Sequence, residues 1–197
     1  MRGEEIPTPR DWKSRGDPDE AKRERLRALI CDRSLLRDRG FVLASGRASN
    51  YFFDMKQTMF DPEGAALLAD LLFDRICDDP VEYVGGLETG AIPLVALVCR
   101  RSWPDKPLKG FFVRKEGKGH GTDQRIDGRF ERGAQVILFE DVTTTGGSVM
   151  QAVERVRAFD GAILKVVSVV DRLEGAIENF RRHGIAFEAL YTRNDFV

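Results

Sequence analysis

The residues best suited to chemistry lie together at positions 136–148, in the run VILFEDVTTTGGS. Two adjacent carboxylates, Glu140 and Asp141, come just before a segment rich in hydroxyls and glycine. Glycine lets a backbone approach a phosphate closely, hydroxyl groups donate hydrogen bonds, and a helix N-terminus adds free N–H groups. Carboxylates repel phosphate but accept hydrogen bonds from ribose hydroxyls or bind Mg²⁺. The run therefore predicts a site for a phosphorylated sugar.

Two familiar nucleotide motifs are absent from this run. It has neither the Gly-Lys-Ser/Thr ending of a Walker A loop nor the GxGxxG spacing of a dinucleotide loop, which leaves ATP and NAD without sequence support. The alternative without chemistry is an ordinary strand-to-helix turn with Thr and Ser as helix caps. The paired acids before the turn favour the sugar-phosphate site.

A second polar run, RKEGKGHGTDQRIDGR at residues 114–129, is called the basic segment below. It contains five Arg or Lys, one His and four Gly, and its only apolar residue is Ile126. A polar segment of this length in a compact domain is usually functional, and we expect it to be mobile. Its positive charge suits a leaving diphosphate, whereas a solvated charged hairpin is the alternative.

The elements that must position these runs alternate between helix and strand. The apolar spacing predicts helices at 21–39, from 62 after an Asp61 cap, at 92–100, after 147, and ending near 184. It predicts strands at 81–86, 109–113, 135–140, 164–171 and 187–190. This alternation indicates an α/β fold with a mostly parallel twisted sheet flanked by helices, with ligands beyond the carboxyl ends of the strands. We expect residues 1–20 to form a flexible arm and 21–197 a single domain.

Composition excludes several function classes. The 197 residues carry 31 Lys or Arg and 32 Asp or Glu, a net charge of −1, so nothing calls for nucleic acid or an anionic membrane. The longest apolar run, residues 91–99, is too short to span a bilayer. Three widely spaced cysteines suggest neither disulfides nor a zinc site. We expect a cytoplasmic protein.

Four segments, in order along the chain, resemble the orotate phosphoribosyltransferase family of type I phosphoribosyltransferases. They are LASGRASNYFFD at 43–54, RKEGKGHGT at 114–122, the run at 136–148, and DRLEG at 171–175. The resemblance implies a small N-terminal hood region, a mobile catalytic loop and a homodimer with shared active sites. It also implies transfer of ribose 5-phosphate from phosphoribosyl diphosphate (PRPP) to orotate in pyrimidine (UMP) synthesis. Mg²⁺ would bind mainly through PRPP, without direct protein ligands.

The resemblance further implies a role for individual residues. The catalytic set is Lys118, His120, Glu140 and Asp141. The PRPP contacts are Thr89, Gly90, Arg114, Lys115, Lys118, His120, Glu140, Asp141, Val142, Thr143, Thr144, Thr145, Gly146, Gly147 and Ser148. The orotate contacts are Phe52, Phe53, Thr144 and Arg172. Arg114, Lys118 and His120 would reach PRPP in the neighbouring subunit, while Lys115 serves its own.

Some of these residues have structural alternatives. The two phenylalanines also suit a core, and Arg172 suits a salt bridge with Asp171 or Glu174. Two family lysines are replaced here by Ala44 and Gly90, and our hypothesis is that Arg47 or Lys56 supplies the missing cation.

Two other functions fit the same motifs. One is a phosphoribosyltransferase for another nucleobase. The other is a regulator that keeps the pocket only to sense PRPP, although such a protein would have little use for the basic segment.

Overall fold

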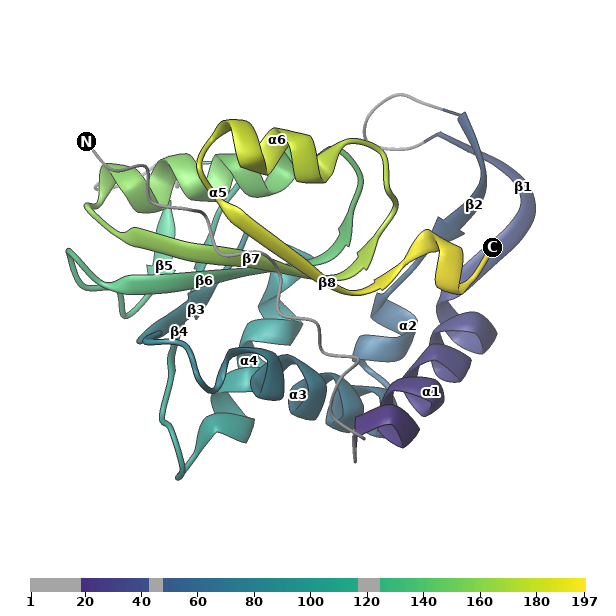
Figure 1. The fold of residues 1–197 in the computed structure, drawn as a ribbon, viewed down its shortest axis with the longest axis horizontal. Coiled ribbons are helices and arrows are strands. Elements are labelled where there is room, and N and C mark those ends of the chain that lie inside the picture. Colours follow the sequence, from purple (N-terminus) through teal and green to yellow (C-terminus); the bar gives the residue numbers. More distant parts are fainter. Residues whose placement is uncertain (1–18, 43–47, 117–124) are drawn as a thin grey trace, which may run out of the picture.

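The computed structural model describes residues 19–42, 48–116 and 125–197. Its centre is a six-stranded sheet in the order β5-β4-β3-β6-β7-β8 (Figure 1). The strands are β3 (Tyr83–Gly85), β4 (Lys109–Val113), β5 (Ile126–Gly128), β6 (Gln135–Thr143), β7 (Ala162–Asp171) and β8 (Ala186–Thr192). All neighbours pair in parallel except β4 and β5. The predicted α/β class with a mostly parallel sheet is confirmed.

Helices cover both faces of the sheet (Figure 1). They are α1 (Asp19–Leu29), the π-helical turn η2 (Ile30–Ser34), α2 (Lys56–Met59), α3 (Pro62–Ile76), α4 (Ala91–Ser102), α5 (Gly147–Ala158), α6 (Ala176–Arg182) and the 3₁₀ turn η3 (Arg193–Asp195). Along β6, Ile137 and Phe139 join the core under α3 and α4, while Val136 and Leu138 join the core under α5 and α6. A strand buried on both faces explains the unbroken apolar run in the sequence. Within the described ranges, no helix is long and apolar enough to cross a bilayer.

The first predicted helix was wrong in its extent. Helical structure ends at Ser34, and β1 (Leu35–Val42) pairs antiparallel with β2 (Ala48–Phe53) where the apolar spacing predicts helix to residue 39. Leu35 and Leu36 satisfy a helical period, but cross-strand pairing with Phe53 and Phe52 decides their structure. The short strand β5 inside the basic segment was also missed, since three residues give too little pattern.

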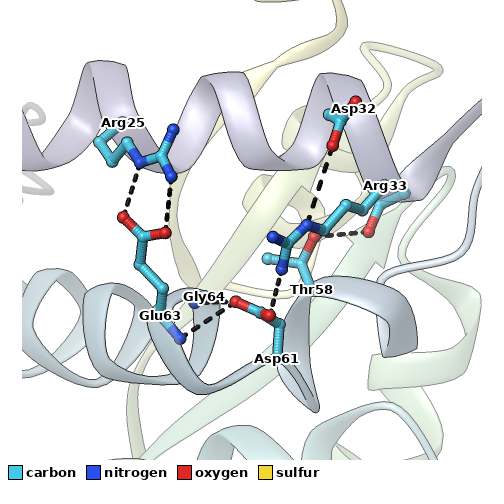
Figure 2. Close-up of polar contacts among 8 residues, drawn as sticks. Arg25, Asp32, Arg33, Thr58, Asp61, Glu63 and Gly64 are labelled. Carbon is cyan, nitrogen blue, oxygen red and sulfur yellow. Dashed lines mark hydrogen bonds and ion pairs between the residues drawn. The ribbon is translucent and has the colours of Figure 1, made fainter.

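Polar contacts join the N-terminal helix to α3, as Figure 2 shows. The Arg25 guanidinium donates to both carboxylate oxygens of Glu63 at 2.6 Å, and Arg33 pairs with Asp61. Asp61 also caps α3 as predicted, because its carboxylate accepts hydrogen bonds from the Glu63 and Gly64 amides. These contacts fix the start of the β1–β2 hairpin relative to the sheet.

Candidate active site

Glu140 and Asp141, called the acid pair below, both lie within β6. The sequence predicts a strand that stops at residue 140, but β6 continues to Thr143 because β7 extends beside it. Val142 pairs with Val170, and Thr143 pairs with Asp171. The longer strand carries the acid pair to the carboxyl edge of the sheet on a rigid element.

The environment of the acid pair raises the pKa of both carboxyl groups. Burial raises the pKa of Glu140 well above its usual value, and the neighbouring Asp141 charge raises it further. Burial also raises the pKa of Asp141, although its carboxylate accepts a 2.8 Å hydrogen bond from the Val142 amide. Among the described residues, no group donates to the buried Oε2 atom of Glu140. Such an acceptor suits a ligand that brings hydroxyl donors.

The loop between β3 and α4 touches both the acid pair and the basic segment. A Cβ atom at Gly90 would lie 2.5 Å from Oδ1 of Asp141, so a lysine there would displace this carboxylate. Glu88 accepts a 2.8 Å hydrogen bond from the Lys115 amide, and the Glu88–Thr89 peptide bond is cis. The Thr89 side chain is exposed. This loop thus brings Thr89, Gly90 and Lys115 to the same edge as Asp141.

The segment that the sequence predicts to hold phosphate, residues 143–148 and called the phosphate loop below, turns from β6 into α5. Gly146 is the N-cap of α5 and adopts φ 79°, a conformation that favours glycine, and it has no side chain with which to cap the helix. The first amides of α5 are therefore directed at the loop with the positive end of the helix dipole. Thr144 and Thr145 are half-buried, and Gly147 and Ser148 are exposed.

Two residues at the end of β6, Val142 and Thr143, direct their side chains into the protein rather than toward a ligand. The Thr143 hydroxyl is buried and donates to Oγ of Ser168 at 2.9 Å. Val142 is half-buried against the core under α3 and α4. The side chains of both residues thus support the strand end.

Arg172 joins the end of β7 to the hairpin. Its side chain is buried and donates to Glu174 at 2.9 Å and to Oγ of Ser49 at 3.0 Å. Its guanidinium carbon lies 4.2 Å from the centre of the Tyr51 ring. The salt bridge that the sequence left open is formed with Glu174, while Asp171 instead accepts from the Leu173 amide.

The two phenylalanines of β2 lie on opposite faces of the hairpin, as strand alternation requires. Phe53 is 4% exposed and packs edge-on against Phe196, so its side chain belongs to the core. Phe52 is half-buried and stacks on Phe41 with ring centroids 5.6 Å apart.

The described ends of the basic segment are fixed to the sheet. Arg114 pairs with Asp127 on β5, and its amide donates to the Arg125 carbonyl at 2.8 Å. A cavity of about 50 Å³ is lined by Arg114 and Lys115 and by Gln151 and Arg155 of α5. Lys118 and His120 lie outside the described residues, as do Ala44 and Arg47.

Comparison with known proteins identifies the family, although no family model matches the chain. The orotate phosphoribosyltransferase of Rhodopseudomonas palustris (strain BisB18) is 46% identical over 182 residues, covering 90% of this chain and 97% of that protein. The orotate phosphoribosyltransferase of Sorangium cellulosum is 41% identical over 181 residues, covering 90% of this chain and 94% of that protein. The chain belongs to the orotate phosphoribosyltransferase family.

Solved structures of orotate phosphoribosyltransferases share the fold. The Mycobacterium tuberculosis enzyme in complex with PRPP matches with a TM-score of 0.75 and 30% identity, covering 89% of this chain and 98% of that chain. The same enzyme with Fe(III) dicitrate matches with a TM-score of 0.78 and 32% identity over the same shares.

Sequence reasoning about the orotate phosphoribosyltransferase motifs missed several supporting residues. Ser49 and Tyr51 lie inside the quoted hairpin motif, yet nothing in their spacing indicates the contact with Arg172 across 123 positions. Asn179, whose side chain donates to the Thr145 carbonyl at 2.8 Å, carries no sequence signal at all.

The raised pKa of Glu140 predicts a pH-dependent gain in stability for Glu140→Gln. The folded protein binds this proton more tightly than the unfolded chain, so the wild type loses stability as the pH rises through the folded pKa. We expect the variant to have the higher Tm at neutral pH, by about 2–4 °C for each kcal/mol gained in the free energy of unfolding. The difference should shrink at acidic pH. Thermal denaturation across a pH series measures this.

Glu154→Gln, an exposed change on α5, is the matched control and should leave the profile unaltered. A Glu140→Gln protein that is no more stable than wild type at neutral pH contradicts the prediction.

Proposed function

We propose that this protein transfers ribose 5-phosphate from PRPP to N1 of orotate, giving orotidine 5′-monophosphate and diphosphate in pyrimidine synthesis. The observation that carries the proposal is the acid pair, in which Oε2 of Glu140 has no partner among the described residues, directly before the helix N-terminus capped by Gly146. A phosphorylated sugar requires both features side by side. Family membership supports the same reaction, since relatives at 41–46% identity carry this name.

Displacement at the anomeric carbon develops positive charge on the ribose and negative charge on the diphosphate. Glu140 and Asp141 would accept hydrogen bonds from the ribose hydroxyls and place negative charge beneath the cationic sugar. The amides at the start of α5, with Thr144, Thr145 and Ser148, would hold the 5′-phosphate. Catalysis then rests on positioning and electrostatics, without a covalent intermediate on the protein.

The orotate site is proposed at the hairpin side of this edge. Arg172 supplies positive charge for the orotate carboxylate, held in place by Glu174, Ser49 and Tyr51. Thr144 and Phe52 would line the base. Because the Phe53 ring is in the core, any contact from Phe53 would come through its backbone.

Mg²⁺ is proposed as the cofactor, bound mainly through PRPP. Mg²⁺ is a hard cation that prefers oxygen ligands, and the diphosphate and ribose of PRPP would supply them. Oε2 of Glu140, which has no partner in the part of the chain that the structure describes, would accept a hydrogen bond from a water molecule of such a complex. When bound, the ion neutralises charge on the diphosphate.

The basic segment is proposed to act between two subunits of a homodimer in the cytoplasm. Arg114, Lys118 and His120 would contact the diphosphate bound by the partner subunit, and Lys115 the one bound by its own. Closure of this segment would also exclude water from the cationic ribose. The three cysteines are free thiols, consistent with a reducing compartment.

The decisive assay measures loss of orotate in the presence of PRPP and Mg²⁺, beside uracil, hypoxanthine and adenine. We expect turnover with orotate alone, because only orotate brings a carboxylate to Arg172. Turnover of a different base would reassign the enzyme within the fold. Binding of PRPP without any turnover would instead identify a regulator.

Removal of the Lys118 charge should lower turnover on the order of 100- to 1,000-fold, since it would contact the leaving diphosphate. Asp141→Asn should also be nearly inactive. If the active sites are shared, an equimolar mixture of Lys118→Ala and Asp141→Asn subunits regains about a quarter of wild-type activity, because half the dimers contain one complete site. Steady-state rates after subunit exchange test this, and a mixture as inactive as its components would rule out sharing.

Lys56 is the described candidate for the missing family cation. Its side chain is exposed, and its Nζ atom lies 2.5 Å from Oδ1 of Asp54. Burial raises the pKa of Asp141, and the positive charge of Lys56 opposes that rise. We expect Lys56→Ala to raise the KM for PRPP by about tenfold. Lys109→Ala, at the opposite edge of the sheet, is the control, and an unchanged KM in both Lys56→Ala and Arg47→Ala would remove the hypothesis.

A further inference from the structure

Helix α6 contacts the phosphate loop through two consecutive residues. The Asn179 side chain donates from Nδ2 to the backbone carbonyl of Thr145 at 2.8 Å, across 34 positions of sequence. The Asn179 side chain is half-buried, and α6 lies beside α5 on one face of the sheet (Figure 1). A side-chain amide from outside the motif therefore sets the direction of one loop carbonyl.

Phe180 fixes the next residue of the loop. A Cβ atom at Gly146 would lie 2.7 Å from Cζ of Phe180, so the glycine backbone rests directly on this ring. Phe180 is fully buried and packs on Phe187 with ring centroids 4.9 Å apart. Because the ring belongs to the core, it holds Gly146 against a surface that does not move easily.

The planarity of the peptide bond links the Asn179 contact to ligand binding. The Thr145–Gly146 bond is trans, so its carbonyl and its N–H group point in opposite directions. When Asn179 holds the Thr145 carbonyl toward α6, the Gly146 N–H must face away from α6. In the proposed complex this N–H group would donate to the phosphate at the N-terminus of α5.

We propose that Asn179 is a positioning residue for the 5′-phosphate of the substrate. It aligns the Gly146 amide before the ligand arrives, which lowers the cost of ordering the loop on binding. This inference rests on the proposed function, because it assumes that the phosphate loop binds the sugar phosphate.

The test compares two probes that separate the subsites, ribose 5-phosphate and inorganic diphosphate, by calorimetric titration. Asn179→Ala and the nearly isosteric Asn179→Leu both lack the donor, and Asn179→Gln retains an amide. We expect the two donor-less variants to bind ribose 5-phosphate about 5- to 10-fold more weakly with diphosphate affinity unchanged, and the Gln variant to recover part of the loss. Arg181→Ala, an exposed change on α6, is the control.

Two results would overturn the proposal. One is wild-type affinity for ribose 5-phosphate in both donor-less variants. The other is an equal loss for both probes together with a lower Tm, which is what a purely structural role produces. Failure of the wild type to consume orotate with PRPP would instead refute the proposed function, so the two failures are distinguishable.

Discussion

Burial of β6 on both faces, and its continued pairing with β7 to Thr143, is the constraint on which the site depends. A strand packed between two layers of helices has a fixed direction and register. Its last residues are therefore delivered to the carboxyl edge of the sheet without freedom to shift. The acid pair, the phosphate loop and the N-terminus of α5 inherit their positions from this strand.

That rigidity places charge where the fold does not favour it. Glu140 and Asp141 are desolvated, which raises the pKa of both carboxyl groups. Oε2 of Glu140 accepts no hydrogen bond from the described residues. Polar groups left in this condition are common where a ligand completes the hydrogen bonding. The hydroxyls of the proposed ribose ligand would supply the missing hydrogen-bond donors. Substrate binding would therefore compensate the buried carboxylates for their lost solvation.

The surroundings of the edge are built from elements remote in sequence. Gly90 lies against Asp141, and Glu88 accepts a hydrogen bond from the Lys115 amide. Arg172 connects the end of β7 to Ser49 and Tyr51 on the hairpin. Each contact joins a loop or hairpin to the rigid strand ends. The parallel strands β3, β4, β6 and β7 make this possible because their carboxyl ends lie on one side of the sheet.

The sequence alone determined the α/β class, the capped helix α3 and the acid–threonine–glycine run, because each depends on residues close together in the chain. The same local rules extended the first helix through Leu35, where pairing with Phe53 makes a strand. Only the tertiary structure decided that Phe53 is core, that Thr143 bonds Ser168, and that Asn179 supports the phosphate loop. These are contacts between residues far apart in the chain, and spacing along a sequence carries no information about which distant side chains the packed fold brings within hydrogen-bond distance.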